Sequence, residues 1–518
     1  MRPRTRRDLF IALSLANLCY LRIWSELLTY TRPDEYLMKL PPGPMQYVAV
    51  MLNVLLLGGI LFGAVNWGRR RFSKSGFRWV EAAFLLFWIV PLNAIRAVLS
   101  NHFDLLRSGL FGILDPRAVE LLAGASTLAA LFLIAKFSPR LAHVAASVLA
   151  LLFPFCAVTF GQAVWKIAQY NPSGFAANPP VPPLPDARTS PRFLWVIADE
   201  WDYRLTFVDR PAGLALPEID RLRRDSLFTE QAYPPGPETP ISLPGYFTGR
   251  LVKSVRYVGP SDLQIRFRDG TGPVSWRDQP SIFTSAHALG FNTALVDWFH
   301  PGCRVLSGLT YCDWWEMARQ FNSMGSSFGE VLPNQTRSLF ETTLISLFGQ
   351  SLAGHQQTGV YHEILREGLA AANNPEFGLT VIHLPVPHAP HAYDRRTGTF
   401  TLGNAPIRGY VDSLALLDRT VGEMRRSLEA SGEWGRTTVL FTSDHHYREE
   451  TALAGEPDDL RIPFLLKMAG QHEGADYRER FNTVLTHDLI LEVLEGHLAT
   501  AADVSHWLDT NRVRAPGL

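Results

Sequence analysis

Long apolar stretches separated by short basic ones fill the first third of the chain. A membrane-spanning helix needs about 20 predominantly apolar residues. Five stretches approach this length, at residues 9–29, 46–67, 79–99, 118–136 and 141–162. We therefore predict a transmembrane domain of five helices over residues 1–165, which would embed the chain in a membrane.

Basic residues are distributed unevenly around these stretches. Four arginines precede the first stretch, GRRRFSKSGFR separates the second from the third, and Lys136 and Arg140 separate the fourth from the fifth. Because basic loops stay in the cytoplasm, we expect a multi-pass protein of the cell (inner) membrane, with a cytoplasmic N-terminus and a periplasmic or extracellular C-terminal domain. A cleaved signal peptide is disfavoured, since Arg22 and Glu26 interrupt the first stretch and four more stretches follow.

A proline-rich segment separates the apolar part of the chain from the remainder. Residues 166–190 include NPSGFAANPPVPPLPDARTS, which shows no helix or strand periodicity. This composition is typical of an extended linker. We predict a linker at 166–190 that holds the next domain off the membrane.

From residue 191 onwards, short apolar runs alternate with helical patterns. Residues 410–432 carry an apolar stripe at helical spacing, and strand-like apolar runs lie at 192–200, 291–298, 377–384 and 437–444. Strands and helices in alternation are typical of an α/β fold. We predict that residues 191–518 form an α/β domain with a largely parallel central sheet.

Residues that bind metals follow the first and the last of these strand-like runs. The first run ends in Asp199 and Glu200, and the last is followed by Asp444, His445 and His446. The carboxyl ends of parallel strands meet at one edge of a sheet, where ligands bind. Carboxylate oxygens with an imidazole nitrogen suit Zn²⁺ or Mn²⁺. We expect Asp199, Asp444 and His445 to bind a divalent metal ion, with Glu200 as a further ligand or a supporting group.

The stretch PGPETPISLPGYFTGR (235–250) supplies a candidate nucleophile. Thr239 precedes Pro240, a residue suited to the first turn of a helix, and a helix N-terminus favours a phosphate group. A hydroxyl bound to a divalent ion loses its proton more easily and attacks as an alkoxide. Thr239 is thus a candidate for both the remaining metal ligand and the nucleophile, although in isolation it would be read as a turn residue.

Four motifs together resemble the alkaline phosphatase/sulfatase superfamily, and the resemblance covers roughly residues 191–495. The motifs are VIADE (196–200), ETPISLPGYFTGR (238–250), HLPVPHAPH (383–391) and FTSDHH (441–446). Within that superfamily, five membrane spans followed by an outward domain resemble the phosphoethanolamine transferases and the lipoteichoic-acid synthases. The resemblance implies a sulfatase-like α/β domain and a metal-dependent hydrolase or transferase.

The resemblance also implies a role for each matching residue. Thr239 matches the nucleophile, and Asp199, Asp444 and His445 match the metal ligands. His388 matches a histidine that binds the substrate phosphate or assists the leaving group, and either His388 or a second histidine, His391, would carry protons during the reaction.

The sequence departs from the superfamily's patterns at two places. Sulfatases place Cys or Ser at the nucleophile position, with Pro two and Arg four residues later, whereas this chain has Thr239, Ile241 and Leu243. Sulfate-ester hydrolysis through formylglycine is therefore not expected. His446 replaces the glycine that usually follows Asp-His, and it would either support the site or disturb it. One metal ion or two remain possible, since His388, His391 and His446 are available for a second site.

The expected reaction moves a phosphoethanolamine- or phosphoglycerol-type group from a phospholipid donor to an envelope glycan or lipid acceptor, through a phospho-threonine intermediate. A hydrolase of the same superfamily that uses water as acceptor is the alternative, and a non-catalytic envelope protein is a third interpretation. The formal net charge is zero, which argues against nucleic acid as a partner.

The four cysteines fall into two groups. Cys19 and Cys156 lie in apolar stretches and are expected to be buried thiols. Cys303 and Cys312 lie in the polar half of the chain, where a disulfide between them is plausible if that half lies outside the cytoplasm.

Overall fold

A computed structural model describes residues 3–102, 140–317, 327–348, 352–401 and 406–514, together with residue 325. The chain forms two compact units and passes between them several times. Unit 1 comprises residues 1–30, 41–171 and 319–352, and unit 2 comprises residues 31–40, 172–318 and 353–518. The domain limits predicted from the sequence are 1–165, 166–190 and 191–518. They assume that the chain passes from one domain to the next only once, and they stay predictions.

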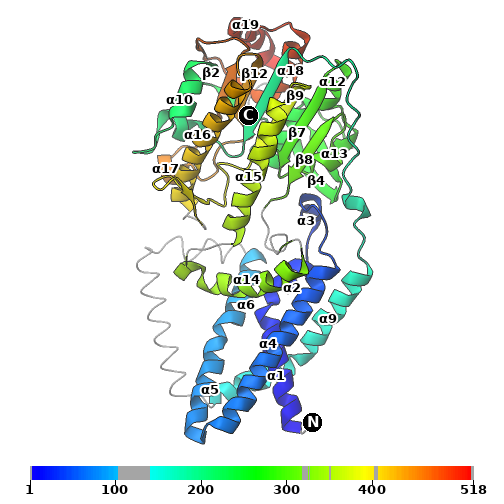
Figure 1. Ribbon diagram of the computed structural model, residues 1–518, viewed down its shortest axis with the longest axis vertical. Helices are drawn as coiled ribbons and strands as arrows, with labels where there is room; N and C mark the ends of the chain where they lie inside the picture. Colours follow the sequence, from blue (N-terminus) through cyan, green and yellow to red (C-terminus); the bar gives the residue numbers. More distant parts are fainter. Residues whose placement is uncertain are drawn as a thin grey trace. The chain divides into compact units, whose positions relative to one another are not determined.

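Unit 1 is built from helices in the part of it that the structure describes (Figure 1). These helices are α1 (Pro3–Cys19), α2 (Leu21–Leu28), α4 (Pro44–Arg71), α5 (Lys74–Phe87), α6 (Ile89–His102), α9 (Phe153–Ala168) and α14 (Phe328–Phe348). Among the described residues, two helices are long and apolar enough to cross a membrane. One is α4 (Pro44–Arg71), and the other is Arg140–Ala168, which includes α9. The bent pair α1–α2 makes a third candidate if both helices belong to one span.

The spans predicted from hydropathy map unevenly onto these helices. The first, second and fifth predicted spans fall on the three candidates. The third, at 79–99, falls on α5 and α6, which are shorter, and the fourth, at 118–136, lies outside the described residues. The structure therefore supports two or three apolar spans, and the five-helix domain stays a prediction.

Helix α14 belongs to unit 1 although it lies far along the sequence from the other helices. Gln335 donates a hydrogen bond to the carbonyl oxygen of Gln46 at 3.0 Å, and Asn53 donates one to the carbonyl oxygen of Leu332 at 2.9 Å. The Thr336 hydroxyl lies 3.0 Å from that of Tyr20. Polar side chains thus fix α14 to the apolar helices, an association that hydropathy did not indicate.

A mixed sheet of eight strands forms the centre of unit 2. In sheet order these strands are β14 (Ala475–Tyr477), β2 (Leu227–Thr229), β13 (Phe464–Lys467), β12 (Thr437–Ser443), β1 (Arg192–Ala198), β9 (Phe377–Leu384), β7 (Asn292–Trp298) and β8 (Tyr311–Trp315). The five strands from β12 to β8 are mutually parallel, whereas β13 runs antiparallel to both of its neighbours. The predicted α/β domain with a largely parallel sheet is confirmed, and all four predicted strands belong to its parallel part.

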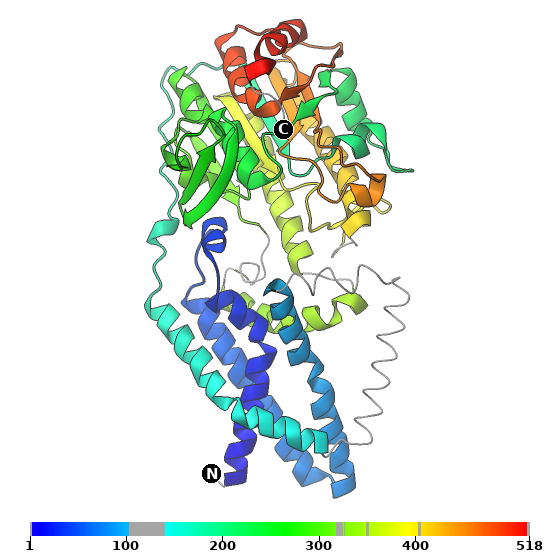
Figure 2. The ribbon, with the colours of Figure 1, turned by 180° about the vertical axis from the view of Figure 1, so that it is seen from behind.

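Helices cover both faces of this sheet (Figures 1 and 2). On one face, α15 (Leu352–Asn373) and α16 (Pro406–Ala430) pack against residues such as Val196. On the other face, Trp195 packs among residues of four helices. These helices are α11 (Thr239–Thr248), α12 (Ile282–Ala288), α18 (Thr486–Glu495) and α19 (Ala501–Asn511). Burial on both faces explains why the central strands are continuous apolar runs.

Smaller elements complete the described part of unit 2. Three further sheets are formed by β4 (Val252–Gly259) with β5 (Asp262–Phe267) and β6 (Val274–Ser275), by β10 (Tyr393–Asp394) with β11 (Thr399–Phe400), and by β15 (Phe481–Asn482) with β3 (Ala232–Tyr233). The short helices are α3 (Arg32–Leu37), α10 (Pro217–Arg224), α13 (Gly302–Val305) and α17 (Thr451–Ala454).

The proline-rich segment belongs to unit 2 from Pro172 onwards, and its backbone is hydrogen-bonded to other parts of that unit. Asn178 and Val181 donate backbone hydrogen bonds to the carbonyl oxygens of Cys303 and Leu309, at 2.7 and 2.9 Å. Further along, Arg188 donates one to the carbonyl oxygen of Gly290. The segment therefore follows the surface of unit 2, beside a disulfide between Cys303 and Cys312. That disulfide agrees with the pairing considered from the sequence.

Candidate active site

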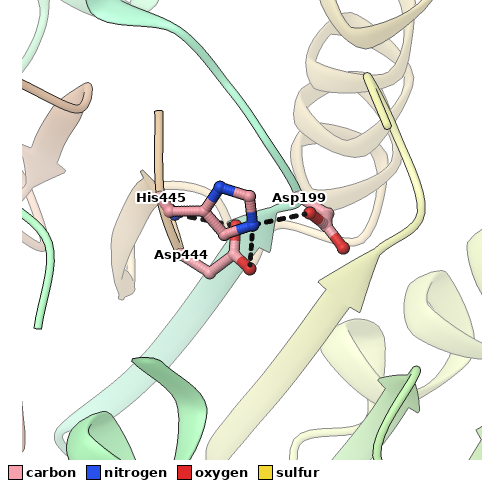
Figure 3. A group of neighbouring side chains, drawn as sticks. All are labelled: Asp199, Asp444 and His445. Atoms are coloured by element: carbon pink, nitrogen blue, oxygen red, sulfur yellow. Dashed lines mark hydrogen bonds and ion pairs between the residues drawn. The ribbon is translucent and has the colours of Figure 1, made fainter. Parts of the chain in front are cut away.

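The carboxyl ends of β1 and β12 bring together three side chains that could hold a metal ion (Figure 3). Strand β1 leads into Asp199, and its neighbour β12 leads into Asp444 and His445. One ligand atom from each of these residues lies within 4.8 Å of the others, and all three residues are buried. Adjacent parallel strands thus join residues that are far apart in the sequence, as the sheet-edge argument predicted.

Thr239 completes this group from the first turn of α11. Its Oγ1 donates a hydrogen bond to Asp444 Oδ2 at 2.7 Å, and it lies 3.5 Å from Asp199 Oδ2 and 3.4 Å from His445 Nε2. The helix begins where the sequence predicted, with Pro240 in its first turn. Thr239 therefore presents its hydroxyl to all three of the proposed metal ligands.

Two glycines allow α11 to fit at this position. A Cβ atom at Gly236 would lie 2.5 Å from the Ile241 side chain, so the chain turns closely over the start of the helix only because this residue has none. At the other end, Gly249 adopts a left-handed conformation with φ of 66°, which ends the helix beside His487. The placement of Thr239 is thereby fixed by backbone geometry at both ends of its helix.

The charges in this cluster favour a bound cation. Burial, and then the neighbouring Asp444 carboxylate, raise the pKa of Asp199 well above its ordinary value, because two negative charges in a buried site repel each other. Asp199 Oδ1 has no hydrogen-bond donor among the residues that the structure describes. With the Thr239 hydroxyl, four oxygen and nitrogen atoms that carry lone pairs thus face one another, and their chemistry fits a divalent metal ion.

The orientation of His445 also suits a metal ligand. Its Nδ1 lies 2.8 Å from the carbonyl oxygen of His446, and a carbonyl only accepts, so Nδ1 carries the hydrogen. In the neutral imidazole, Nε2 then has a free lone pair, and it lies 3.5 Å from Asp444 Oδ2 and 3.6 Å from Asp199 Oδ1. A backbone carbonyl that fixes the tautomer in this way is a common feature of metal-binding histidines.

Glu200 lies beside the cluster and makes a different contact. Its carboxylate binds the Arg448 guanidinium at 2.6 Å. Its backbone has a positive φ of 61°, and it is held there because the amide donates to Asp444 Oδ1 at 3.1 Å while the carbonyl accepts from the Tyr410 hydroxyl at 2.7 Å. A non-glycine residue in this region is strained. In this left-handed conformation the Glu200 amide contacts Asp444, while the Glu200 side chain pairs with Arg448.

The predicted catalytic histidines lie on the segment that follows β9. His388 Nε2 is 4.0 Å from Glu200 Oε2, so this histidine lies near the cluster. His391 is buried, and its Nδ1 lies 3.1 Å from the Ser413 hydroxyl. Burial lowers the pKa of His388 and lowers that of His391 to about 4, so both imidazoles are neutral at neutral pH. Burial also lowers the pKa of His446.

The structure adds two histidines that sequence reasoning did not place in the site. His383, inside β9, has its Nε2 3.9 Å from Asp199 Oδ2, and its Nδ1 lies 3.2 Å from Asp297 Oδ1. Its signal in the sequence was a polar residue within an apolar strand. His300 is fully buried, and burial lowers its pKa to about 3. It contacts the backbone of Thr239, with Nε2 3.4 Å from the carbonyl oxygen.

Residues 191–495 match the family model described as Sulfatase. The match spans more than half of the chain, and the chain therefore belongs to the sulfatase family, within the alkaline phosphatase/sulfatase superfamily. Members of this superfamily are hydrolases and phosphotransferases that use divalent metals. No curated protein matches the chain.

The solved structures that match this chain share little sequence with it. The lipoteichoic acid synthase LtaP from Listeria monocytogenes is 17% identical, and the alignment covers 60% of this chain and 73% of LtaP with a TM-score of 0.38. The phosphonate monoester hydrolase of Agrobacterium radiobacter is 14% identical, with 59% and 74% of the two chains covered and a TM-score of 0.40.

Proposed function

We propose that this protein is a membrane-anchored phosphotransferase whose nucleophile is Thr239 and which depends on a divalent metal. It moves a phosphoethanolamine- or phosphoglycerol-type group from a phospholipid to an envelope glycan or lipid. The observation that carries the proposal is the position of Thr239 Oγ1, which lies 2.7 to 3.5 Å from Asp444, His445 and Asp199. A threonine that serves only to begin a helix does not need three metal-binding neighbours.

Asp199, Thr239, Asp444 and His445 would hold the metal ion, which when bound would favour the ionised hydroxyl and stabilise charge on the phosphoryl oxygens. In the first step, Thr239 Oγ1 attacks the phosphorus of the donor and the bond to the diacylglycerol oxygen breaks. The threonine hydroxyl gives up one proton and the diacylglycerol gains one. The product on the protein is a phospho-threonine ester.

In the second step Thr239 is the leaving group, and the acceptor is the nucleophile. A hydroxyl of the acceptor attacks the phosphorus, the bond to Thr239 Oγ1 breaks, and the proton of the acceptor is returned to the threonine. His388 and His391 are neutral at neutral pH because burial lowers their pKa values, so either imidazole is ready to accept the acceptor's proton. Where water replaces the acceptor, the same chemistry is hydrolysis.

Two features support an extracytoplasmic catalytic domain. The disulfide between Cys303 and Cys312 suits an oxidising compartment. Residues 31–40, from the loop between the first two predicted spans, fold within unit 2 together with residues 172–318 and 353–518. Segments of one compact unit lie on the same side of a membrane, which agrees with the orientation that the basic residues predict.

The decisive experiment is mass spectrometry of the Thr239 peptide after incubation of the full-length protein with a phospholipid labelled in its headgroup. We expect a labelled phosphate ester on Thr239 in the wild type, and loss of both label and turnover in Thr239→Ala with an unchanged fold. Full activity in Thr239→Ala would refute the nucleophile. Release of free headgroup phosphate even when candidate glycans are present would favour the hydrolase.

A further inference from the structure

A short segment between the apolar helices α2 and α4 folds into the core of unit 2. Residues 31–40 contain α3, which begins with a capping box between Thr31 and Asp34. Tyr36 and Met38 are completely buried, and Leu37 belongs to the hydrophobic core beside the sheet. Hydropathy assigns this segment to a loop, but its apolar residues form part of the interior of the catalytic unit.

Polar contacts hold the same segment in place. The Arg304 guanidinium is buried, and it donates hydrogen bonds to the carbonyl oxygens of Tyr36 at 2.6 Å and Met38 at 2.9 Å. The Glu316 carboxylate accepts a hydrogen bond from the backbone amide of Lys39. Buried backbone groups require such partners, so the segment is held in one defined position.

The Tyr36 side chain reaches towards the nucleophile through one histidine. Its hydroxyl lies 3.1 Å from His300 Nδ1, and His300 Nε2 lies 3.4 Å from the carbonyl oxygen of Thr239. The Thr239 carbonyl only accepts, so Nε2 carries the hydrogen of the neutral ring. Nδ1 is then the acceptor, and the Tyr36 hydroxyl donates to it. The direction of donation is therefore the same in both hydrogen bonds: Tyr36 donates to His300, and His300 donates to the carbonyl oxygen of Thr239.

We infer that Tyr36 is a positioning residue for the nucleophile, which it orients through His300 by fixing the backbone of Thr239. This inference rests on the proposed function, since it takes Thr239 as the nucleophile. A nucleophile held by its backbone carbonyl keeps its hydroxyl aligned with the metal ligands, and small displacements of reacting groups lower rates strongly. The loop between the first two predicted spans is then part of the active-site scaffold.

The test uses the full-length protein in detergent, with bis(p-nitrophenyl) phosphate as substrate and added Mn²⁺ or Zn²⁺. Tyr36→Phe keeps the ring and removes the hydroxyl. We expect kcat to fall about tenfold, which corresponds to about 1.4 kcal/mol, while KM stays within about twofold. Tyr257→Phe is the matched control because its ring lies 5.3 Å from that of Tyr36 and its hydroxyl is outside the Tyr36–His300–Thr239 chain. We expect it to keep wild-type kcat.

Variants of His300 separate positioning from simple packing. The His300→Gln amide reaches close to the place of Nε2 and can present an N–H there, whereas the shorter His300→Asn amide reaches only the place of Nδ1. We expect His300→Gln to retain several-fold more kcat than His300→Asn, since only the former can donate to the Thr239 carbonyl. A histidine that merely filled space would not produce this order.

The outcomes distinguish the inference from the proposed function. If Thr239→Ala keeps its activity, the nucleophile is wrong, and the inference fails with it. If Thr239→Ala is inactive while Tyr36→Phe equals Tyr257→Phe in kcat, the proposed function stands and the positioning role is overturned. Equal kcat values for His300→Gln and His300→Asn would also overturn that role.

Discussion

Substitution of Asp199 by Asn should stabilise the metal-free protein and weaken its response to metal. The ligand atoms of Asp199 and Asp444 lie within 4.8 Å of each other in a buried site. Two unit negative charges at that distance repel by about 3.5 kcal/mol at an effective dielectric constant of about 20. Protonation of Asp199 already relieves part of this repulsion, because burial and Asp444 raise its pKa. We therefore expect Asp199→Asn to gain about 1–3 kcal/mol of unfolding free energy without metal.

The metal response should change in the opposite direction. An ion present at 100 times its Kd stabilises the folded wild type by about 2.7 kcal/mol. Asp199→Asn has lost a charged ligand, so at the same metal concentration its stabilisation should be less than half as large. A variant that is more stable without metal and less active with it would show that the carboxylate is retained for function at a cost in stability.

The assay is thermal unfolding of the full-length protein in detergent, with a chelator and then with added Zn²⁺ or Mn²⁺. In the chelator we expect the midpoint of Asp199→Asn to lie at least about 2 °C above that of the wild type. A folded-state pKa above the ordinary value of 3.8 means that wild-type stability is lost as the pH rises from about 4 towards that folded-state pKa. Asp199→Asn should lack this loss.

The control is another buried carboxylate that lies outside the cluster. Asp202 accepts backbone hydrogen bonds from Leu205 at 2.8 Å and Tyr447 at 3.4 Å. We expect Asp202→Asn to keep the full metal-dependent rise in midpoint. The reasoning would be refuted if Asp199→Asn were less stable than the wild type in the chelator, or if it responded to metal as the wild type does.

Two further substitutions test the surroundings of the site. The Tyr246 hydroxyl is buried and donates to the Ser443 carbonyl at 2.8 Å, so Tyr246→Phe should cost about 1–2 kcal/mol of unfolding free energy; an unchanged midpoint would contradict this. Replacement of Cys303 and Cys312 by Ser opens a loop with a sequence separation of 9 and should cost about 2–3 kcal/mol. Reductant should lower the wild-type midpoint to the value of that variant, and a midpoint that does not respond to reductant would argue against the disulfide.

The sequence by itself determined the central strands and the residues at their ends. Continuous apolar runs identify strands that are buried on both faces, and parallel strands end at a common edge, so Asp199, Asp444 and His445 were predicted to meet. Thr239 was predicted at a helix N-terminus because Pro240 favours that position, and the structure places its hydroxyl 2.7 Å from Asp444. These predictions depend on local patterns, which a sequence contains in full.

Only the tertiary structure decided which distant segments support the site. The pairing of Glu200 with Arg448 follows from a left-handed backbone at Glu200 that Asp444 and Tyr410 hold in place. The docking of residues 31–40 in unit 2 follows from shape and from hydrogen bonds to Arg304. Neither leaves a periodic or compositional signal, because the contacts join residues hundreds of positions apart and depend on geometry that forms when the chain folds.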